Sequence, residues 1–322
     1  MNIGNLNIDG NLFSAPLAGI SDSVFRTLCR EYGASATVSE MVSAQGLKFS
    51  DKKTRKYLFF TDKERPIGIQ LFGPDPDSAL RGLEKALEVN PDFIDFNLGC
   101  PVRKVIKQGS GAALLQNPEL AAEIIKTMVK NSPIPVTAKM RSGWDSSSIV
   151  FPELSLRLQD VGVSAIFIHP RTVAQGFCGE ADRGLVCRTK PKLKVPVIYS
   201  GDIRSPGDAG DVVEHTGSDG IMIGRAAMGD PSIFHRVRQF FETGEIIPAP
   251  TPPEKIDMLL DHHARVKDRY GDDFTVKYMR KFIVWYTHQL PRKSELRREL
   301  FNLSDCGEVI TRLKEYRSSL AS

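Results

Sequence analysis

The sequence lacks the features that mark membrane-spanning and disulfide-bonded proteins. Its apolar runs fall well short of the roughly 18 residues that a membrane-spanning helix needs. No basic residue precedes Arg26, so the charged start of a secretory signal is missing. The five cysteines are odd in number, widely spaced and without a C-x-x-C pair, which argues against a disulfide framework and a zinc site. We therefore expect a cytoplasmic protein that carries no metal ion.

Net charge is also low, at +4 over 322 residues, and it is unevenly placed. Residues 262–322 hold 13 Lys and Arg against 8 Asp and Glu, a net charge of +5, while all earlier residues together carry −1. A basic segment of this kind favours a polyanionic partner. A well-solvated helical surface is the alternative that charge alone leaves open.

A third missing pattern concerns the fold. No G-x-G-x-x-G motif follows the first apolar run, which disfavours a doubly wound, dinucleotide-binding sheet. Helices are expected between most of the apolar runs, at 77–89, from 118 onward, at 149–161 and at 206–215. Eight runs have the length and the Val, Ile and Phe content of buried parallel strands, at residues 12–15, 36–39, 67–71, 93–96, 136–139, 165–168, 195–199 and 220–223.

Eight strand–helix units in residues 1–244 predict an α/β fold, a (β/α)8 TIM barrel. Its last helix is expected to start at Asp230 and Pro231, a good N-cap and first-turn pair. Four prolines within residues 248–253 predict a stiff linker over 245–252. A small all-helical domain is expected over 253–322, with its own core around Ile283, Tyr286 and Leu290. Its helices are predicted at 253–270, 275–288, 294–301 and 305–318.

The run Asn97-Leu98-Gly99-Cys100-Pro101 is the most informative local feature. It follows the apolar strand at 93–96 and so leaves the C-terminal end of the barrel, where the chemistry of this fold collects. Glycine and proline turn the chain outward and present the Cys100 thiol to a ligand above the barrel. The thiol is a candidate nucleophile, metal ligand or acid, with a buried structural cysteine as the alternative.

Other strand ends bring further groups to the same mouth. Gln70 lies near the end of the third strand. Lys139 ends the fifth strand, where a buried lysine needs an anionic partner. His169 and Arg171 follow the sixth strand and either point at a ligand or lie in a solvated loop. The first strand ends in the apolar run Ala15-Pro16-Leu17-Ala18-Gly19. That run suits the edge of a flat aromatic ligand, with a plain tight turn as the alternative.

Two glycine-bearing loops indicate what kind of ligand this is. Ser200-Gly201-Asp202 ends the seventh strand and Gly224-Arg225-Ala226-Ala227 the eighth. Backbone N–H groups in such loops can approach an anion closely, and this pair of loops is the recurrent phosphate grip of the barrel. A flat, phosphorylated ligand beside a glutamine and a lysine suggests FMN. Gln70 would bond the pyrimidine edge of its ring, and Lys139 would stabilise negative charge there.

With these motifs in one order, the chain resembles the bacterial tRNA-dihydrouridine synthases, most closely their B-type. The resemblance extends over nearly the whole chain. It is carried by the first-strand run, the cysteine run and the Gly224 loop quoted above. It is also carried by Ser39-Glu40-Met41, Lys139-Met140-Arg141-Ser142-Gly143-Trp144 and Gly201-Asp202-Ile203.

The resemblance implies a barrel that binds FMN and a helical region that binds tRNA. NADPH would reduce the FMN, hydride would pass to C6 of a uracil base in tRNA, and Cys100 would protonate C5. A free thiol has a pKa near ~8.5, so at neutral pH it carries the proton that this role needs. The residues that the resemblance assigns to FMN are Pro16, Leu17, Ala18, Gln70, Lys139, Ser200, Gly201, Asp202, Gly224 and Arg225. Asn97, His169 and Arg171 are the candidates for holding the uracil or the flavin edge.

The chain departs from many family members at two positions. Pro170 stands where glycine is common and stiffens the loop that carries Arg171. Ser200 stands where asparagine is common, so a contact to the cofactor there would run through the backbone or a water molecule.

Two other functions compete with this interpretation. The first is another FMN barrel that acts on a small molecule, as dihydroorotate dehydrogenase does; the basic C-terminal helices argue against it. The second is an RNA-binding protein with a vestigial barrel, against which the complete set of Cys100, Lys139, His169 and Arg171 argues. We expect a monomer, with tRNA phosphates bound by the barrel rim and by basic residues of the helices. Those residues are Arg280, Lys281, Arg292, Lys293, Arg297 and Arg298.

Overall fold

The computed structural model describes residues 1–48 and 52–320, and its central feature is a barrel of parallel strands. The sheet runs in the order β3, β11, β10, β9, β8, β7, β6 and β4, and β5 pairs with the end of β6. One bridge between Phe13 and Ala36 spans the gap between β3 and β4, so the barrel is nearly closed. The barrel strands are β3 (Leu12–Ser14), β4 (Thr37–Val38), β5 (Val42–Ser43), β6 (Ile67–Phe72), β7 (Phe93–Leu98), β8 (Val136–Arg141), β9 (Ala165–His169), β10 (Val197–Ser200) and β11 (Gly220–Ile223).

The predicted TIM barrel is therefore confirmed, and each of the eight predicted strands is present. An N-terminal hairpin, β1 (Asn2–Ile3) and β2 (Leu6–Asn7), was not predicted because its strands are only two residues long. Ile3 of this hairpin is fully buried and packs in the cluster that fills the barrel interior. In that cluster the rings of Phe13 and Phe167 meet edge to face, with centroids 5.1 Å apart.

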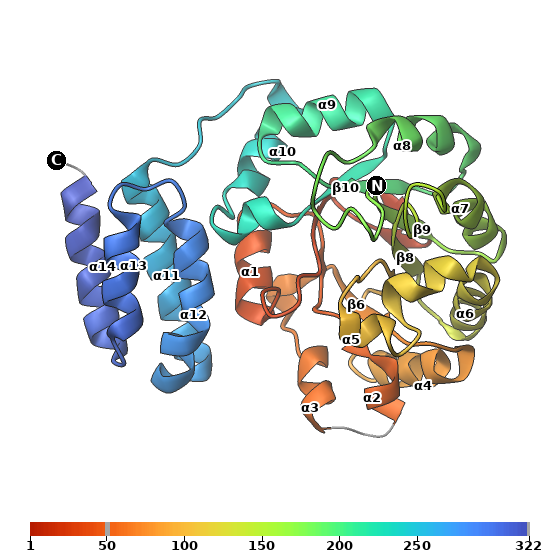
Figure 1. The fold of residues 1–322 in the computed structure, drawn as a ribbon, viewed down its shortest axis with the longest axis horizontal. Helices are drawn as coiled ribbons and strands as arrows, with labels where there is room; N and C mark the ends of the chain where they lie inside the picture. The colour runs from red at the N-terminus through yellow and green to blue at the C-terminus, as the bar shows by residue number, and fades with distance from the viewer. Residues whose placement is uncertain (49–51, 321–322) are drawn as a thin grey trace.

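Helices surround the barrel (Figure 1). The N-caps follow sequence chemistry: Asn117 and Asp75 each accept a hydrogen bond from a backbone N–H of the first helical turn, and a proline follows each. The α-helices are α1 (Ser23–Glu31), α2 (Ala44–Lys48), α3 (Lys52–Arg55), α4 (Pro76–Leu87), α5 (Arg103–Ile106), α6 (Pro118–Asn131), α7 (Phe151–Asp160), α8 (Arg183–Thr189), α9 (Pro206–Thr216) and α10 (Ile233–Thr243). Short 3-10 helices are η1 (Lys56–Leu58), η2 (Asp62–Glu64), η3 (Gly111–Gln116), η4 (Lys190–Lys192) and η5 (Arg225–Met228).

The start of α10 differs from the prediction. The helix begins at Ile233, and Asp230 does not cap it. The Asp230 carboxylate instead accepts a hydrogen bond from the Ser232 hydroxyl and forms an ion pair with Arg236 one turn later. A carboxylate held by a nearby guanidinium is not free to accept from the backbone N–H groups of the first turn.

Four further helices follow an extended connection that crosses from α10 to the side of the barrel (Figure 1). They are α11 (Pro252–Tyr270), α12 (Asp272–Tyr286), α13 (Lys293–Asn302) and α14 (Cys306–Leu320). Thr251 and Glu254 form a capping box at the start of α11, and Gly271, with φ of +80°, ends that helix. Within the residues that the structure describes, no helix has both the length and the apolar character to cross a membrane.

The helical region does not have the separate core that we expected. Phe282 of α12 is fully buried and lies against Phe25 of α1, with ring centroids 5.8 Å apart. His262 of α11 packs on the same two rings. Ile283, Tyr286 and Leu290 belong to the apolar cluster that continues under the barrel helices. His262 of α11 and Phe282 of α12 thus both cover Phe25 of α1, so these two helices bury apolar side chains against the barrel domain.

Candidate active site

A cavity of about 730 Å³ opens at the C-terminal ends of the barrel strands. The barrel contributes one wall, and Lys255, Trp285 and His288 from α11 and the end of α12 contribute the other. Of the predicted site residues, those that line it are Pro16, Leu17, Ala18, Gln70, Asn97, Cys100, Lys139, His169, Ser200, Gly201, Asp202, Gly224 and Arg225. Arg171 alone among the predicted residues does not.

A chain of hydrogen bonds leads from the barrel interior to the cysteine run. Gln70 Nε2 donates to Asp95 Oδ2 at 2.7 Å, and Asn97 Nδ2 donates to Gln70 Oε1 at 2.8 Å. Asn97 Oδ1 then accepts from the backbone N–H groups of Gly99 and Cys100, at 3.0 and 2.8 Å. The Asp95 carboxylate can only accept, so the amide nitrogen of Gln70 must point toward it. The Gln70 oxygen then accepts from Asn97, which fixes the orientation of the second amide. The loop that carries Cys100 is thereby tied to a fully buried carboxylate.

Strand register explains why these side chains meet. Residues two apart on a strand point to the same face, so Asp95 and Asn97 both face the barrel interior. Asp95 lies opposite Gln70 of β6 and Thr137 of β8, and Asn97 lies opposite Lys139. Thr137 Oγ1 donates to the second Asp95 oxygen at 2.7 Å. The polar groups thus form two adjacent layers of the kind that fill the interior of this fold.

Burial shifts the ionisation of both charged groups in these layers. Desolvation raises the pKa of Asp95 to about 6, against the hydrogen bonds from Gln70 and Thr137 and the charge of Lys139. Desolvation also lowers the pKa of Lys139 to about 8, with Asp95 opposing the shift. Burial in a low-dielectric interior disfavours the charged form of each group. The opposite charge of the other group offsets part of that cost.

Cys100 is a half-buried free thiol in the cavity wall. Desolvation raises its pKa, although the backbone N–H of Val102 and the charges of Arg141 and Lys139 act in the opposite direction. The thiol therefore keeps its proton at neutral pH. A protonated thiol is suited to donate a proton rather than to attack as a thiolate.

His169 is neutral in this site. Desolvation, together with the nearby positive charges of Lys139, Arg141, Arg171 and Arg225, lowers its pKa to about 2. Its ring lies 6.1 Å from that of Phe177, centroid to centroid. Its Nε2 lies 3.4 Å from Arg171 Nη1 and accepts from that guanidinium, so the neutral imidazole has its Nδ1–H to offer a ligand and adds no positive charge to the cavity.

Arg171 does not line the cavity and instead binds neighbouring loops of the protein. Its side chain is 1% exposed, and its terminal nitrogens bind both oxygens of Asp202 at 3.0 and 2.6 Å. Nε donates to the carbonyl of Cys178 at 3.2 Å and Nη2 to that of Gly179 at 2.5 Å. With its donors engaged in this way, Arg171 holds the 178–179 loop and the Asp202 turn together.

The opposite side of the cavity is suited to an anion. Gly201 has φ of +135°, and a Cβ there would come within 3.0 Å of His169, so the close approach of these loops requires glycine. Beside it, the N–H groups of Gly224, Arg225 and Ala226 donate to no acceptor within the described residues. The side chains of Arg204 and Arg225 are 76% and 39% exposed and lie 3.6 Å from Asp202. Free N–H groups and partly exposed guanidinium groups together form a phosphate-binding surface.

Residues 13–321 match the protein family described as "Dihydrouridine synthase (Dus)". This chain belongs to the dihydrouridine synthase family. The resemblance predicted from the motifs is thereby confirmed, and the family match disfavours the small-molecule alternative.

Relatives match this chain over nearly its full length. The chain is 36% identical over 322 residues to tRNA-dihydrouridine synthase B of Escherichia coli strain K12, covering 100% of both chains. It is 35% identical over 314 residues to the protein of the same name from Pseudomonas aeruginosa, covering 98% of this chain and 95% of the relative.

Solved structures with a similar fold also match this chain. A morphinone reductase in complex with tetrahydroNAD matches with a TM-score of 0.52 and 12% identity, over 79% of this chain and 92% of that chain. An old yellow enzyme homologue from Zymomonas mobilis matches with a TM-score of 0.53 and 13% identity, over 77% and 92%. At these identities the likeness establishes the barrel and nothing of the substrate.

Several residues that line the cavity were not predicted from the sequence. Arg141 lies two residues after Lys139 on the same strand face, so the period of two was a usable signal. No sequence signal pointed to Phe177. This residue is 58% exposed, and its ring lies beneath the guanidinium groups of Arg225 and Arg141, at 4.3 and 5.6 Å. Trp285 and His288 reach the cavity only because α12 docks against the barrel.

Proposed function

We propose that this protein reduces uridines of tRNA to 5,6-dihydrouridine, using bound FMN and NADPH, with Cys100 as the donor of the proton to C5. The observation that carries the proposal is the shared cavity. A protonated thiol, an amide pair and a buried lysine lie on one side, and a phosphate-binding surface lies on the other. The family match and the two full-length relatives supply the substrate class.

The lining fits FMN at three places. The apolar run at Pro16, Leu17 and Ala18 would meet the edge of the flavin ring, and Gln70 and Lys139 its pyrimidine end. The phosphate would lie on the loops of Ser200, Gly201, Asp202, Gly224 and Arg225. The cavity volume of about 730 Å³ is within the roughly 300–1,000 Å³ of small-molecule and cofactor sites. When bound, FMN supplies the hydride that is taken from NADPH.

Cys100 delivers the second hydrogen atom as a proton. Its thiol remains protonated at neutral pH and lies at the cavity wall, so an S–H proton is available to C5 of a uracil inserted between the thiol and the opposite wall. The resulting thiolate regains a proton from solvent, which reaches this half-exposed residue. Asn97 positions the loop of Cys100 and has a second amide hydrogen free for a carbonyl of the base.

The remaining predicted residues take supporting roles. Lys139 stabilises negative charge at the pyrimidine edge, and neutral His169 offers a hydrogen bond to the base or the flavin edge. Arg171 positions Asp202 and touches neither ligand. Arg141 donates to the carbonyls of Thr172 and Gly176 and adds positive charge to the cavity lining. We place the reaction in the cytoplasm, where tRNA is found, and assign it to a monomer.

The test is a reconstituted reaction. Purified protein with FMN, NADPH and an unmodified tRNA transcript is expected to yield dihydrouridine, quantified by mass spectrometry of the digested RNA. An absence of dihydrouridine with each of a panel of transcripts, in a preparation that retains flavin, would overturn the proposal. Orotate and a simple enone serve as substrate controls. Faster flavin oxidation by either compound than by tRNA would favour the small-molecule alternative instead.

A further inference from the structure

A row of aromatic rings crosses from the barrel to the helical region outside the cavity. It starts at Phe59, continues through Tyr270 at the end of α11, and ends with Phe274 and Tyr278 on α12. Ring centroids are 4.8 Å apart from Tyr270 to Phe274 and 4.8 Å from Phe274 to Tyr278, and the latter two rings are stacked. We call these four residues the aromatic row.

Two cations lie on the aromatic row. The Arg269 guanidinium lies over the Phe59 ring at 4.1 Å and over Tyr270 at 5.7 Å, and so connects the barrel to the helices. The Lys281 ammonium lies 3.4 Å from the centre of the Tyr278 ring. Each cation is attracted to a ring face and has N–H donors left for an anion.

The row is exposed. Phe274 is 44% exposed, Phe59 42% and Tyr270 37%. A single exposed aromatic residue is ordinary, but a contiguous row of them marks a binding surface. The two segments that carry the row, residues 55–65 and 265–281, together contain ten Lys and Arg against five Asp and Glu, while the Asp22 and Glu40 carboxylates lie near Tyr278.

We propose that the aromatic row is a stacking surface for unpaired bases of the bound RNA next to the uridine in the cavity, an inference that rests on the proposed tRNA substrate. Bases stack on aromatic side chains whatever their identity, and phosphates pair with cations interleaved among the rings. A protein partner would meet an apolar patch, but it would gain nothing from cations held over ring faces in a region of net positive charge.

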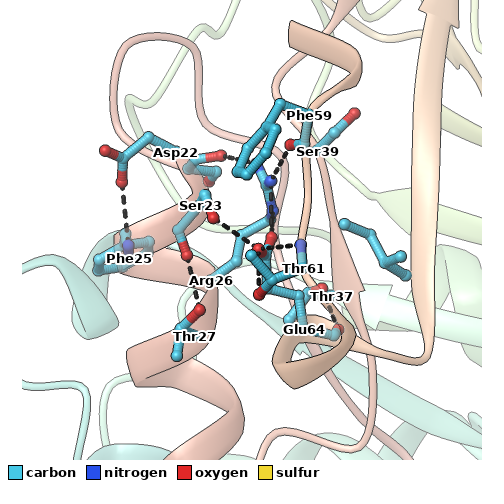
Figure 2. Close-up of polar contacts among 12 residues, drawn as sticks. Asp22, Ser23, Phe25, Arg26, Thr27, Thr37, Ser39, Phe59, Thr61 and Glu64 are labelled. Atoms are coloured by element: carbon cyan, nitrogen blue, oxygen red, sulfur yellow. Dashed lines mark hydrogen bonds and ion pairs between the residues drawn. The ribbon is translucent and has the colours of Figure 1, made fainter. Parts of the chain in front are cut away.

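The Phe59 end of the row is held from beneath by a buried ion pair (Figure 2). The Arg26 guanidinium binds the Glu64 carboxylate at 2.7 Å and donates to the Phe59 carbonyl at 2.9 Å. Glu64 also accepts from the Thr61 N–H at 2.7 Å and from the Ser23 hydroxyl at 2.5 Å. The backbone of Phe59 is thus anchored in the protein while its ring stays at the surface. Preorganised rings lose little conformational entropy when a base stacks on them.

The other end of the row meets the cavity rim. The Lys281 ammonium donates to the carbonyl of Gly19, and the N–H of Gly19 donates to Glu40. Ala18, which precedes Gly19, and Met41, which follows Glu40, both line the cavity. A strand whose uridine enters the cavity therefore crosses this rim, and its adjacent bases come within reach of Tyr278 and Phe274.

Substitutions at Phe274 separate stacking from packing. Phe274→Leu keeps apolar bulk without the ring and is expected to weaken affinity for unmodified tRNA by about tenfold. Phe274→Tyr keeps the ring and is expected to bind within about twofold of the native protein. Phe59→Leu repeats the test at the barrel end. Ile246→Ala, which trims a 66% exposed side chain away from the row, is the matched control.

Each variant is measured in three ways. The dissociation constant for a tRNA transcript is determined at several salt concentrations, KM and kcat are determined for dihydrouridine formation, and flavin reduction by NADPH is followed without tRNA. The leucine variants are expected to raise KM with kcat and flavin reduction unchanged. Arg269→Gln is expected to lower the salt slope of log affinity by about 1, since one phosphate contact is lost.

The outcomes are distinct. If the native protein forms dihydrouridine and Phe274→Leu binds tRNA as tightly as it does, the stacking inference is overturned and the proposed function stands. Equal losses with leucine and tyrosine would assign Phe274 a packing role and also overturn it. A change in self-association by light scattering, without a change in tRNA affinity, would assign the surface to a protein contact. If the native protein forms no dihydrouridine, the proposed function itself fails.

Discussion

Arg171 and Asp202 form a two-pronged ion pair, with both terminal nitrogens of the guanidinium on both oxygens of the carboxylate at 3.0 and 2.6 Å. The motifs suggested that both residues touch ligands, but the pair makes them a brace between β9 and β10. Asp202 has φ of +52°, a left-handed conformation that the brace holds in place. The carboxylate still lines the cavity, and its pKa is lowered by the hydrogen bond and charge of Arg171, in opposition to desolvation.

Removal of Arg171 is expected to destabilise the protein. Arg171→Met leaves Asp202 without its main partner, and truncation of one member of a buried pair costs about 3–5 kcal/mol. Since the Asp202 side chain is 18% exposed, the lower end of that range is expected. The free energy of unfolding from urea titration is the measurement. Arg204→Gln, at a 76% exposed position 3.6 Å from the same carboxylate, is the control and is expected to change stability by less than about 1 kcal/mol.

Loss of the Cys100 thiol is expected to slow the chemistry and leave the fold intact. Cys100→Ala removes the proton donor, and general acid catalysis contributes typically 10²–10⁴-fold to a rate. Single-turnover formation of dihydrouridine, after flavin reduction, is expected to fall at least about 100-fold, with unchanged flavin content and tRNA affinity. Cys187→Ala, at an exposed position outside the cavity lining, is expected to behave as native. Native turnover in Cys100→Ala would rule out the acid role.

The charge of Lys139 gives the protein a pH dependence on the alkaline side. Burial lowers its pKa from 10.5 to about 8, so the stabilising charge is present below pH 8 and is lost above it. Flavin reduction is expected to slow as pH rises through about 8, and Lys139→Met is expected to be slow at every pH. The unfolded chain binds more protons than the folded chain between these two pKa values, so stability rises with pH across that window. In Lys139→Met, denaturation followed from pH 8 to 10 is expected to lack this rise.

Asp95 has the opposite effect on the acid side. Burial raises its pKa from 3.8 to about 6, so the folded chain holds a proton that the unfolded chain has lost. Its contribution to stability therefore falls as pH rises from about 4 to 6. Asp95→Asn keeps an acceptor for Gln70 and removes the titration. A flatter stability profile between pH 4 and 6 is expected, measured by urea denaturation against the native protein. An unchanged profile would show that Asp95 ionises normally.

The helical region is expected to depend on its contact with α1. Phe282→Ala empties a fully buried site against Phe25 and is expected to cost about 3–5 kcal/mol. Val284→Ala, two residues along the same helix at a 37% exposed position, is expected to cost less than about 1 kcal/mol. Thermal unfolding of both variants is the measurement. A second, earlier transition in Phe282→Ala would show that the helices unfold apart from the barrel.

The barrel and most of its lining were accessible from residue order. Apolar runs of strand length show where strands lie, and in this fold the residue after each strand faces the mouth. That is why the sequence alone assigns Gln70, Lys139 and the two glycine loops to the cavity. Asp95 was not assigned to the site, although a carboxylate within an apolar strand is a usable signal. Its role depends on which groups the neighbouring strands place opposite it.

Local chemistry therefore settles which segments form strands, which turns need glycine and which end of the barrel holds the thiol, since each depends on a few adjacent residues. Local chemistry does not determine which distant side chains contact one another. Arg171 binds the carboxylate of Asp202, 31 residues further along the chain. Phe282 packs on a ring of α1, and the Phe59 ring lies under the Arg269 guanidinium of α11. Those pairings follow from how helices and loops dock, and docking depends on the shape of whole surfaces, which no short stretch of residues encodes.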